Sequence, residues 1–118
     1  MATNRIKGIT IEIDGNTTPL SKSLKDVDKS LKDTQNQLND VNKLLKLDPS
    51  NVELLRQKQD LLGKAIEGTK ARQDELKKAL EQAKNAGDTE ENRRQQDLLQ
   101  RELIETEQKL KGYEDQLK

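Results

Sequence analysis

The sequence lacks the side chains on which most catalytic and metal sites depend. Its 118 residues include no cysteine, histidine, tryptophan or phenylalanine, and only one tyrosine. Without cysteine the chain has neither a disulfide nor a thiol nucleophile, and without histidine it lacks the commonest general base and metal ligand. It also contains neither of the glycine-rich loop motifs that bind phosphates. We therefore expect no enzyme activity, no metal and no cofactor.

Long apolar runs and an excess of charge of one sign are also missing. No apolar stretch approaches the ~20 residues that span a bilayer, and the first residues alternate isoleucine with polar side chains, unlike a signal peptide. The 22 basic residues balance the 22 acidic ones, whereas nucleic-acid-binding domains are normally basic. We expect no membrane, nucleic acid or small-molecule substrate as a partner.

The hydrophobic residues that are present suit a thin core. They make up 30% of the chain, against roughly 45–50% in typical globular domains, and nearly all are Leu, Ile, Val or Ala. Intrinsic disorder is the alternative, but disordered chains usually combine low hydrophobicity with high net charge. Because the net charge here is zero and the leucines are periodic, an elongated folded chain is favoured.

The opening sequence RIKGITIEIDG predicts a β-strand over residues 5–14. Ile9, Ile11 and Ile13 alternate with polar residues, and this period of two is typical of a strand. No second β-rich run is found in residues 16–118, and an isolated strand leaves its backbone groups unpaired. We therefore expect the strand to pair with the same strand of another copy, or with an edge strand of a partner protein. A disordered N-terminal tail is the alternative.

After this strand, the hydrophobic residues follow alternating steps of three and four, which is the heptad pattern of a coiled coil. The pattern predicts a first helix over residues 19–46, with Thr18 as its N-cap. The sequence KLDPSNVE ends this helix, because proline disfavours a helical conformation in the preceding residue. Ser50 and Glu53 have the spacing of a capping box and predict a second helix over residues 50–86. The short connection indicates an antiparallel hairpin.

The sequence NAGDTEEN separates the second helix from the C-terminal part of the chain. An unbroken helix would place seam positions at 97 and 101, whereas the next leucines are Leu98 and Leu99. The seam has therefore slipped by about two residues, while coiled coils tolerate insertions of three or four. We predict a turn and a third helix over residues 89–117; one bent helix is the alternative.

Together these elements predict an all-α fold. We expect an elongated antiparallel helical hairpin or coiled coil of two to three long helices, preceded by a short β-strand, as one domain over residues 1–118. Among polar seam positions, Gln59 and Gln73 are candidates for fixing the helix register. The hydrophobic residues assigned to the packing and self-association seam are Ile9, Ile11, Ile13, Leu24, Val27, Leu31, Leu38, Val41, Leu45, Leu55, Leu62, Ile66, Leu76, Leu80, Leu99, Leu103 and Leu110.

Three segments of the first half resemble one family of phage proteins. They are RIKGI, IDGNT and LNDVNKLLKLDP, which stand in this order. In this combination the chain resembles the N-terminal region of phage tail tape measure proteins, particularly those of siphophages and prophages of Gram-positive bacteria. The resemblance is close over residues 4–67 and rests on helical character alone beyond them.

The resemblance implies a structural role in phage tail assembly. Tape measure proteins are long, mostly helical chains that lie inside the tail tube, set the tail length and leave the tail during DNA ejection. It further implies a homo-oligomer that contacts tail-tube and tail assembly chaperone proteins, located in the virion tail and, during assembly, in the host cytoplasm. We expect this chain to be an N-terminal segment of such a protein or a short relative.

A stand-alone coiled-coil adaptor or regulator is the alternative function. Such a protein captures a partner helix in a groove between its own helices. It would stay monomeric until the partner arrives, whereas a tape measure segment would self-associate in a defined small number.

Overall fold

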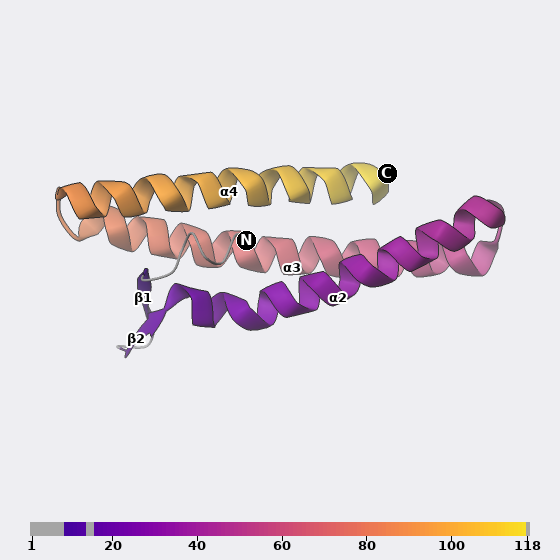
Figure 1. Cartoon of the computed structure of the whole chain (residues 1–118), viewed down its shortest axis with the longest axis horizontal. Helices are drawn as coiled ribbons and strands as arrows, with labels where there is room; N and C mark the ends of the chain where they lie inside the picture. The colour runs from indigo at the N-terminus through magenta and orange to yellow at the C-terminus, as the bar shows by residue number, and fades with distance from the viewer. Residues whose placement is uncertain (1–8, 14–15, 118) are drawn as a thin grey trace.

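The computed structural model describes residues 9–13 and 16–117 and shows a rod of three long helices that carries a small β-hairpin (Figure 1). Successive helices run in opposite directions, and the rod measures 56 × 23 × 21 Å. The all-α elongated hairpin predicted from the sequence is confirmed. In chain order the elements are β1 (Thr10–Ile13), β2 (Asn16–Pro19), α2 (Leu20–Leu47), α3 (Val52–Asn85) and α4 (Glu90–Leu117).

The N-terminal strand finds its partner within its own chain. β1 pairs antiparallel with β2, in a register that sets Ile11 opposite Thr18 and Ile13 opposite Asn16. The expectation that residues 16–118 hold no second strand, and that this strand therefore pairs with another copy or a partner protein, is wrong. Of the predicted strand 5–14, residues 5–8 and 14 lie outside the described residues.

The hairpin also begins the first helix. Thr18 lies in β2 instead of capping α2, so the predicted N-cap is wrong, and no side chain caps this end. The backbone N–H of Leu20 donates instead to the carbonyl of Ile9 at 2.8 Å. The first turn of a helix leaves N–H groups without partners inside the helix. Here the hairpin backbone satisfies one of them, which fixes the direction in which α2 leaves the sheet.

The α2–α3 turn is closed by an asparagine. The Asn51 side chain accepts a hydrogen bond from the N–H of Leu54 at 2.9 Å, so Asn51 is the N-cap and the predicted capping box of Ser50 and Glu53 is wrong. Glu53 accepts hydrogen bonds from Arg56 instead. Asn and Ser are about equally good N-caps, which explains why the sequence prediction missed the N-cap by one residue.

The α3–α4 turn confirms that the second and third helices are separate. Gly87 has a φ of +109°, which glycine adopts without the steric cost that a side chain imposes. Two residues later, the hydroxyl of Thr89 accepts a hydrogen bond from the N–H of Asn92 at 3.1 Å and caps α4. The chain therefore reverses here rather than continuing as one bent helix.

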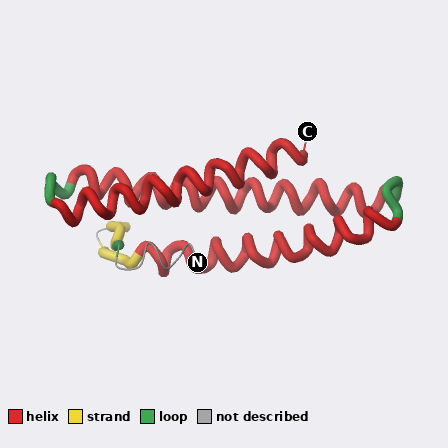
Figure 2. Tube along the Cα trace, turned by 45° about the horizontal axis from the view of Figure 1, so that its top comes forward, coloured by secondary structure: helices red, strands yellow, loops and turns green. Residues whose placement is uncertain are grey.

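Helix α3 forms the centre of the rod, because α2 and α4 both pack along it (Figures 1 and 2). Buried hydrophobic side chains gather in two clusters, one near the hairpin and one toward the α2–α3 turn. Fully burying a Leu or Ile side chain stabilises a fold by about 1.5–3 kcal/mol. The hairpin cluster contains Ile9, Ile11, Leu20, Leu24, Leu76, Ala79, Ala83, Leu99 and Leu103. The turn cluster contains Leu38, Val41, Leu61, Leu62 and Ala65, with Leu45, Leu54 and Tyr113 packed against it.

Between the clusters, α3 carries a glycine where α2 approaches it. A Cβ atom added at Gly68 would lie 2.8 Å from Cδ2 of Leu31 on α2, whereas one added at Gly63 would meet nothing within 4 Å. Gly68 therefore serves the packing of α2, and Gly63 has no such constraint.

The two glycines give a matched pair of substitutions. Gly63→Ala should raise the free energy of unfolding by up to about 1 kcal/mol, because alanine favours the helix over glycine. Gly68→Ala gains the same preference but must displace Leu31, so we expect a smaller gain or a net loss. Urea unfolding followed by circular dichroism measures both. Equal stabilisation by the two variants would contradict the close approach of α2 at Gly68.

Candidate interaction surfaces

Most of the predicted seam residues lie inside the rod, where they join the chain's own helices. These buried side chains are therefore not accessible to another copy of the chain. Leu55 is the exception, with 43% of its surface exposed, and the side chain of Ile13 lies outside the part of the chain that the structure describes. Buried seam residues are Ile9, Ile11, Leu24, Leu38, Val41, Leu62, Leu76, Leu99 and Leu103. Half-buried ones are Val27, Leu31, Leu45, Ile66, Leu80 and Leu110.

A buried polar centre joins all three helices between the two hydrophobic clusters. Its middle is Arg72 of α3, whose Nε donates to Oδ1 of Asp28 on α2 at 2.9 Å. Nη1 of the same guanidinium donates to the hydroxyl of Thr106 at 2.6 Å, and Nη2 donates to Oε2 of Glu102 at 3.1 Å, both on α4. One arginine side chain thus bonds to both neighbouring helices.

The polar centre is shielded from water, which makes it costly to disturb. The side chain of Glu102 is fully buried, while those of Arg72 and Asp28 are 10% and 26% exposed. Removing one partner of a buried ion pair leaves the other charge without compensation. Thr106 is also satisfied, because its hydroxyl donates to the carbonyl of Glu102 at 2.7 Å.

Sequence reasoning missed this centre and placed the register residues elsewhere. Gln59 is exposed and Gln73 only half-buried, so the prediction for Gln59 is wrong, and the buried polar contacts belong to Arg72. Arg72 stands in a sequence with 22 basic residues, most of them on solvated faces. The available signal was the heptad phase, because Arg72 directly precedes the predicted seam position Gln73.

Substitutions at Arg72 test the strength of this centre. Arg72→Ala should lower the free energy of unfolding by about 3–5 kcal/mol, because Glu102 then stays buried without the guanidinium charge. The exposed Arg56, which pairs with Glu53 and Asp60, is the matched control, and Arg56→Ala should cost about 0–1 kcal/mol. Urea unfolding measures both values.

The double variant Arg72→Leu with Glu102→Leu separates the cost of leaving a buried charge unpaired from the cost of losing side-chain packing. Hydrophobic replacement of a buried ion pair is often neutral or stabilising by about 1–4 kcal/mol, so the double variant should be more stable than Arg72→Ala. An Arg72→Ala variant that is no less stable than Arg56→Ala would contradict the buried centre.

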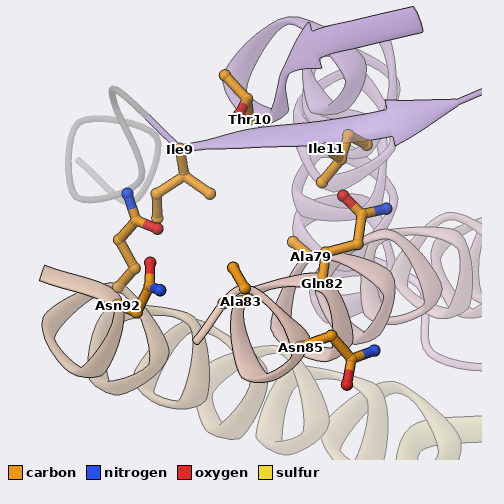
Figure 3. Close-up of a pocket in the computed structure, with 10 residues that line it drawn as sticks. Ile9, Thr10, Ile11, Ala79, Gln82, Ala83, Asn85 and Asn92 are labelled. Atoms are coloured by element: carbon orange, nitrogen blue, oxygen red, sulfur yellow. The ribbon is translucent and has the colours of Figure 1, made fainter. Parts of the chain in front are cut away.

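A hollow opens beside the hairpin, between β1 and the end of the rod where α3 turns into α4 (Figure 3). Its volume is about 580 Å³. Ile9 and Ile11 are buried against the helices, whereas Thr10 is exposed. The remaining lining residues are Ala79, Gln82, Ala83, Asn85, Ala86, Asn92 and Gln95. The amide side chains of Gln82, Asn85, Asn92 and Gln95 can donate and accept hydrogen bonds, and none of the residues that line the hollow carries a charge.

Tyr113, the only aromatic residue of the chain, reports on the packing of the turn cluster. It packs against the turn cluster from α4, and burial raises its pKa above the ordinary value of 10.0. A raised pKa means that the folded state favours the neutral phenol. The folded chain therefore has its full stability at a pH below the pKa that Tyr113 has in the unfolded chain. It loses stability as the pH rises through the pKa that Tyr113 has in the folded chain.

Titration of this side chain is simple, because the chain has a single tyrosine and no tryptophan. We expect the phenolate absorbance of the folded chain to rise with a midpoint above pH 10.0, and the midpoint to fall toward the ordinary value in concentrated urea. The same midpoint in both states would show that α4 does not cover the turn cluster.

The described residues present neither a metal cluster nor a membrane helix. Across residues 9–13 and 16–117, no group of three or more Asp or Glu side chains is arranged to hold a metal ion. In the same ranges no helix has the apolar length that crossing a bilayer requires. Comparison with known proteins gives no further guidance: no family model matches the chain, and neither a curated protein nor a solved structure is significantly similar to it.

Proposed function

We propose that this chain is a structural module of phage tail assembly, equivalent to the N-terminal segment of a tape measure protein. The observation that carries the proposal is the sequence of residues 4–67, which resembles that region of the family. Within the described residues this stretch covers the hairpin, α2 and the first half of α3. Its task is to associate with further copies and with tail-tube and tail assembly chaperone proteins.

The shape and surface of the rod suit such a role. A structure 56 Å long and 23 × 21 Å across offers long polar helix faces along which other proteins can lie. Its 22 basic and 22 acidic residues leave no strong field to repel copies of itself, since balanced charge permits association. We further propose that the chain performs no catalysis, because it has no histidine or cysteine.

A coiled-coil adaptor that binds a partner helix is the second candidate. The observation in its favour is the uncovered beginning of α3, where Val52 is 80% and Leu55 is 43% exposed. An amphipathic helix from another protein could lie along this stretch. Light scattering at several concentrations separates the two functions, because a tape measure segment self-associates alone and an adaptor stays monomeric without its partner.

Binding to tail proteins is the direct test of the proposed function. The purified chain is mixed with tail-tube subunits and tail assembly chaperone of the phage or prophage that encodes it, and polymerised tubes are sedimented. We expect the chain to sediment with the tubes and to increase the amount of tube formed. The control is Leu24→Asp, which places a charge at a fully buried position and should abolish folding and binding together.

The proposal is contradicted if the folded chain remains in the supernatant and tube formation is unchanged by it. Circular dichroism of the same sample establishes that the chain was folded during the assay.

A further inference from the structure

The β-hairpin leaves one edge of β1 without a partner strand. β1 pairs with β2 on one side, and no third strand joins this sheet in the part of the chain that the structure describes. The main-chain groups along such an edge are unpaired donors and acceptors, with which an extended chain can pair. The free edge of β1 is therefore a candidate interaction surface.

The hydrogen bond between Leu20 and Ile9 shows which main-chain groups point toward this edge. The two residues continue the register of the hairpin, and the N–H of Leu20 donates to the carbonyl of Ile9 at 2.8 Å. Hydrogen-bonded and non-hydrogen-bonded pairs alternate along an antiparallel ladder. The pairs that Thr10 and Glu12 form with β2 are therefore the non-hydrogen-bonded ones. Consequently, the N–H and C=O groups of Thr10 and Glu12 point away from β2.

The hollow beside the hairpin gives access to this edge. Thr10 lines the hollow, whose volume is about 580 Å³. Its side chain lies on the opposite side of the strand from those of Ile9 and Ile11, which point toward the helices (Figure 3). Thr10 therefore borders the hollow with its main chain. A chain that enters the hollow meets a donor and an acceptor at this residue.

The lining of the hollow suits an uncharged peptide. Asn85, the last residue of α3, and Gln95 on α4 contribute carboxamides, which both donate and accept hydrogen bonds as a peptide group does. A charged side chain brought into this uncharged lining would lose its hydration without gaining an ionic partner. Small side chains leave room for an apolar one instead. They are Ala79, Ala83 and Ala86.

From the free edge and this lining we infer that the hollow binds an extended peptide segment of a partner protein, which adds a third strand beside β1. The main chain of the segment pairs with Thr10 and Glu12 and supplies affinity, while the hollow selects its side chains. Successive side chains of a strand point to opposite faces, so the segment alternates apolar residues with uncharged polar ones. The inference goes beyond the proposed function, because it assigns a binding site to the hairpin rather than to the helix faces.

Amide hydrogen exchange of the full chain tests the inference with a defined probe, the neutral capped peptide acetyl-Thr-Val-Thr-Val-Thr-amide. In the chain alone, the amide of Ile11 should exchange slowly because it bonds to β2, whereas the amides of Thr10 and Glu12 should exchange fast. These two amides should slow about tenfold once the probe reaches roughly ten times its dissociation constant. The control probe acetyl-Thr-Lys-Thr-Lys-Thr-amide, which carries two charges, should not slow them.

Paired substitutions locate the binding edge. Thr10→Pro removes an N–H that points away from β2, where an edge strand tolerates proline. It should raise the dissociation constant of the probe, read from the amide of Glu12, about tenfold. The matched control Thr17→Pro removes an N–H from the outer edge of β2 and should leave the constant unchanged. Gln95→Ala should raise the constant a few-fold, whereas Gln96→Ala, beside it and outside the lining of the hollow, should not.

The inference is overturned if the amides of Thr10 and Glu12 exchange as slowly as that of Ile11 without the probe, because the edge is then already occupied. It is also overturned if the neutral probe slows neither amide, or if Thr17→Pro weakens binding as much as Thr10→Pro. Circular dichroism establishes that each variant is folded, and Gln95→Ala decides the matter if Thr10→Pro does not fold. The assay contains no tail protein, so its outcome is independent of the sedimentation with tail tubes that tests the proposed function.

Discussion

The structure depends on one helix being buried on two sides. With 30% hydrophobic residues and one aromatic side chain, the chain cannot fill a wide core. It solves this by placing α3 between α2 and α4, so that one helix provides hydrophobic contacts to both neighbours. Ala65, Ala79 and Ala83 on α3 are buried, and such small side chains allow helices to lie close together. Without α4 the α4-facing stripe of α3 would be exposed to water along its length.

Arg72 adds a directional constraint to this packing. Hydrophobic contacts alone allow two helices to slide by a heptad, because leucines recur at the same spacing. The guanidinium has partners at fixed positions on α2 and α4, Asp28 and Glu102, and a shift of either helix would leave a buried charge unpaired. Buried polar groups have this role in some coiled coils, and Arg72 is placed to have it here.

Sequence periodicity was enough to predict the three helices, the antiparallel turns and the two-residue slip that separates α3 from α4. It was not enough for the β-hairpin, because Asn16–Pro19 is short, polar and ends in proline, and its pairing depends on the register with β1. It also missed Arg72, since a charged residue beside a seam position is normally solvated. Whether such a residue turns inward depends on partners 44 and 30 residues away, which local spacing does not encode.

The central claim is that one chain folds its helices back on themselves and thereby buries its own seam. Small-angle X-ray scattering at concentrations low enough to keep the chain monomeric tests this most directly. The account predicts a radius of gyration close to the 17.0 Å of the Cα atoms and a maximum dimension only slightly above 56 Å. If α3, α4 and the residues between them formed one continuous helix from Val52 to Leu117, its length would be roughly 100 Å at 1.5 Å per residue. A maximum dimension of that size would contradict the account.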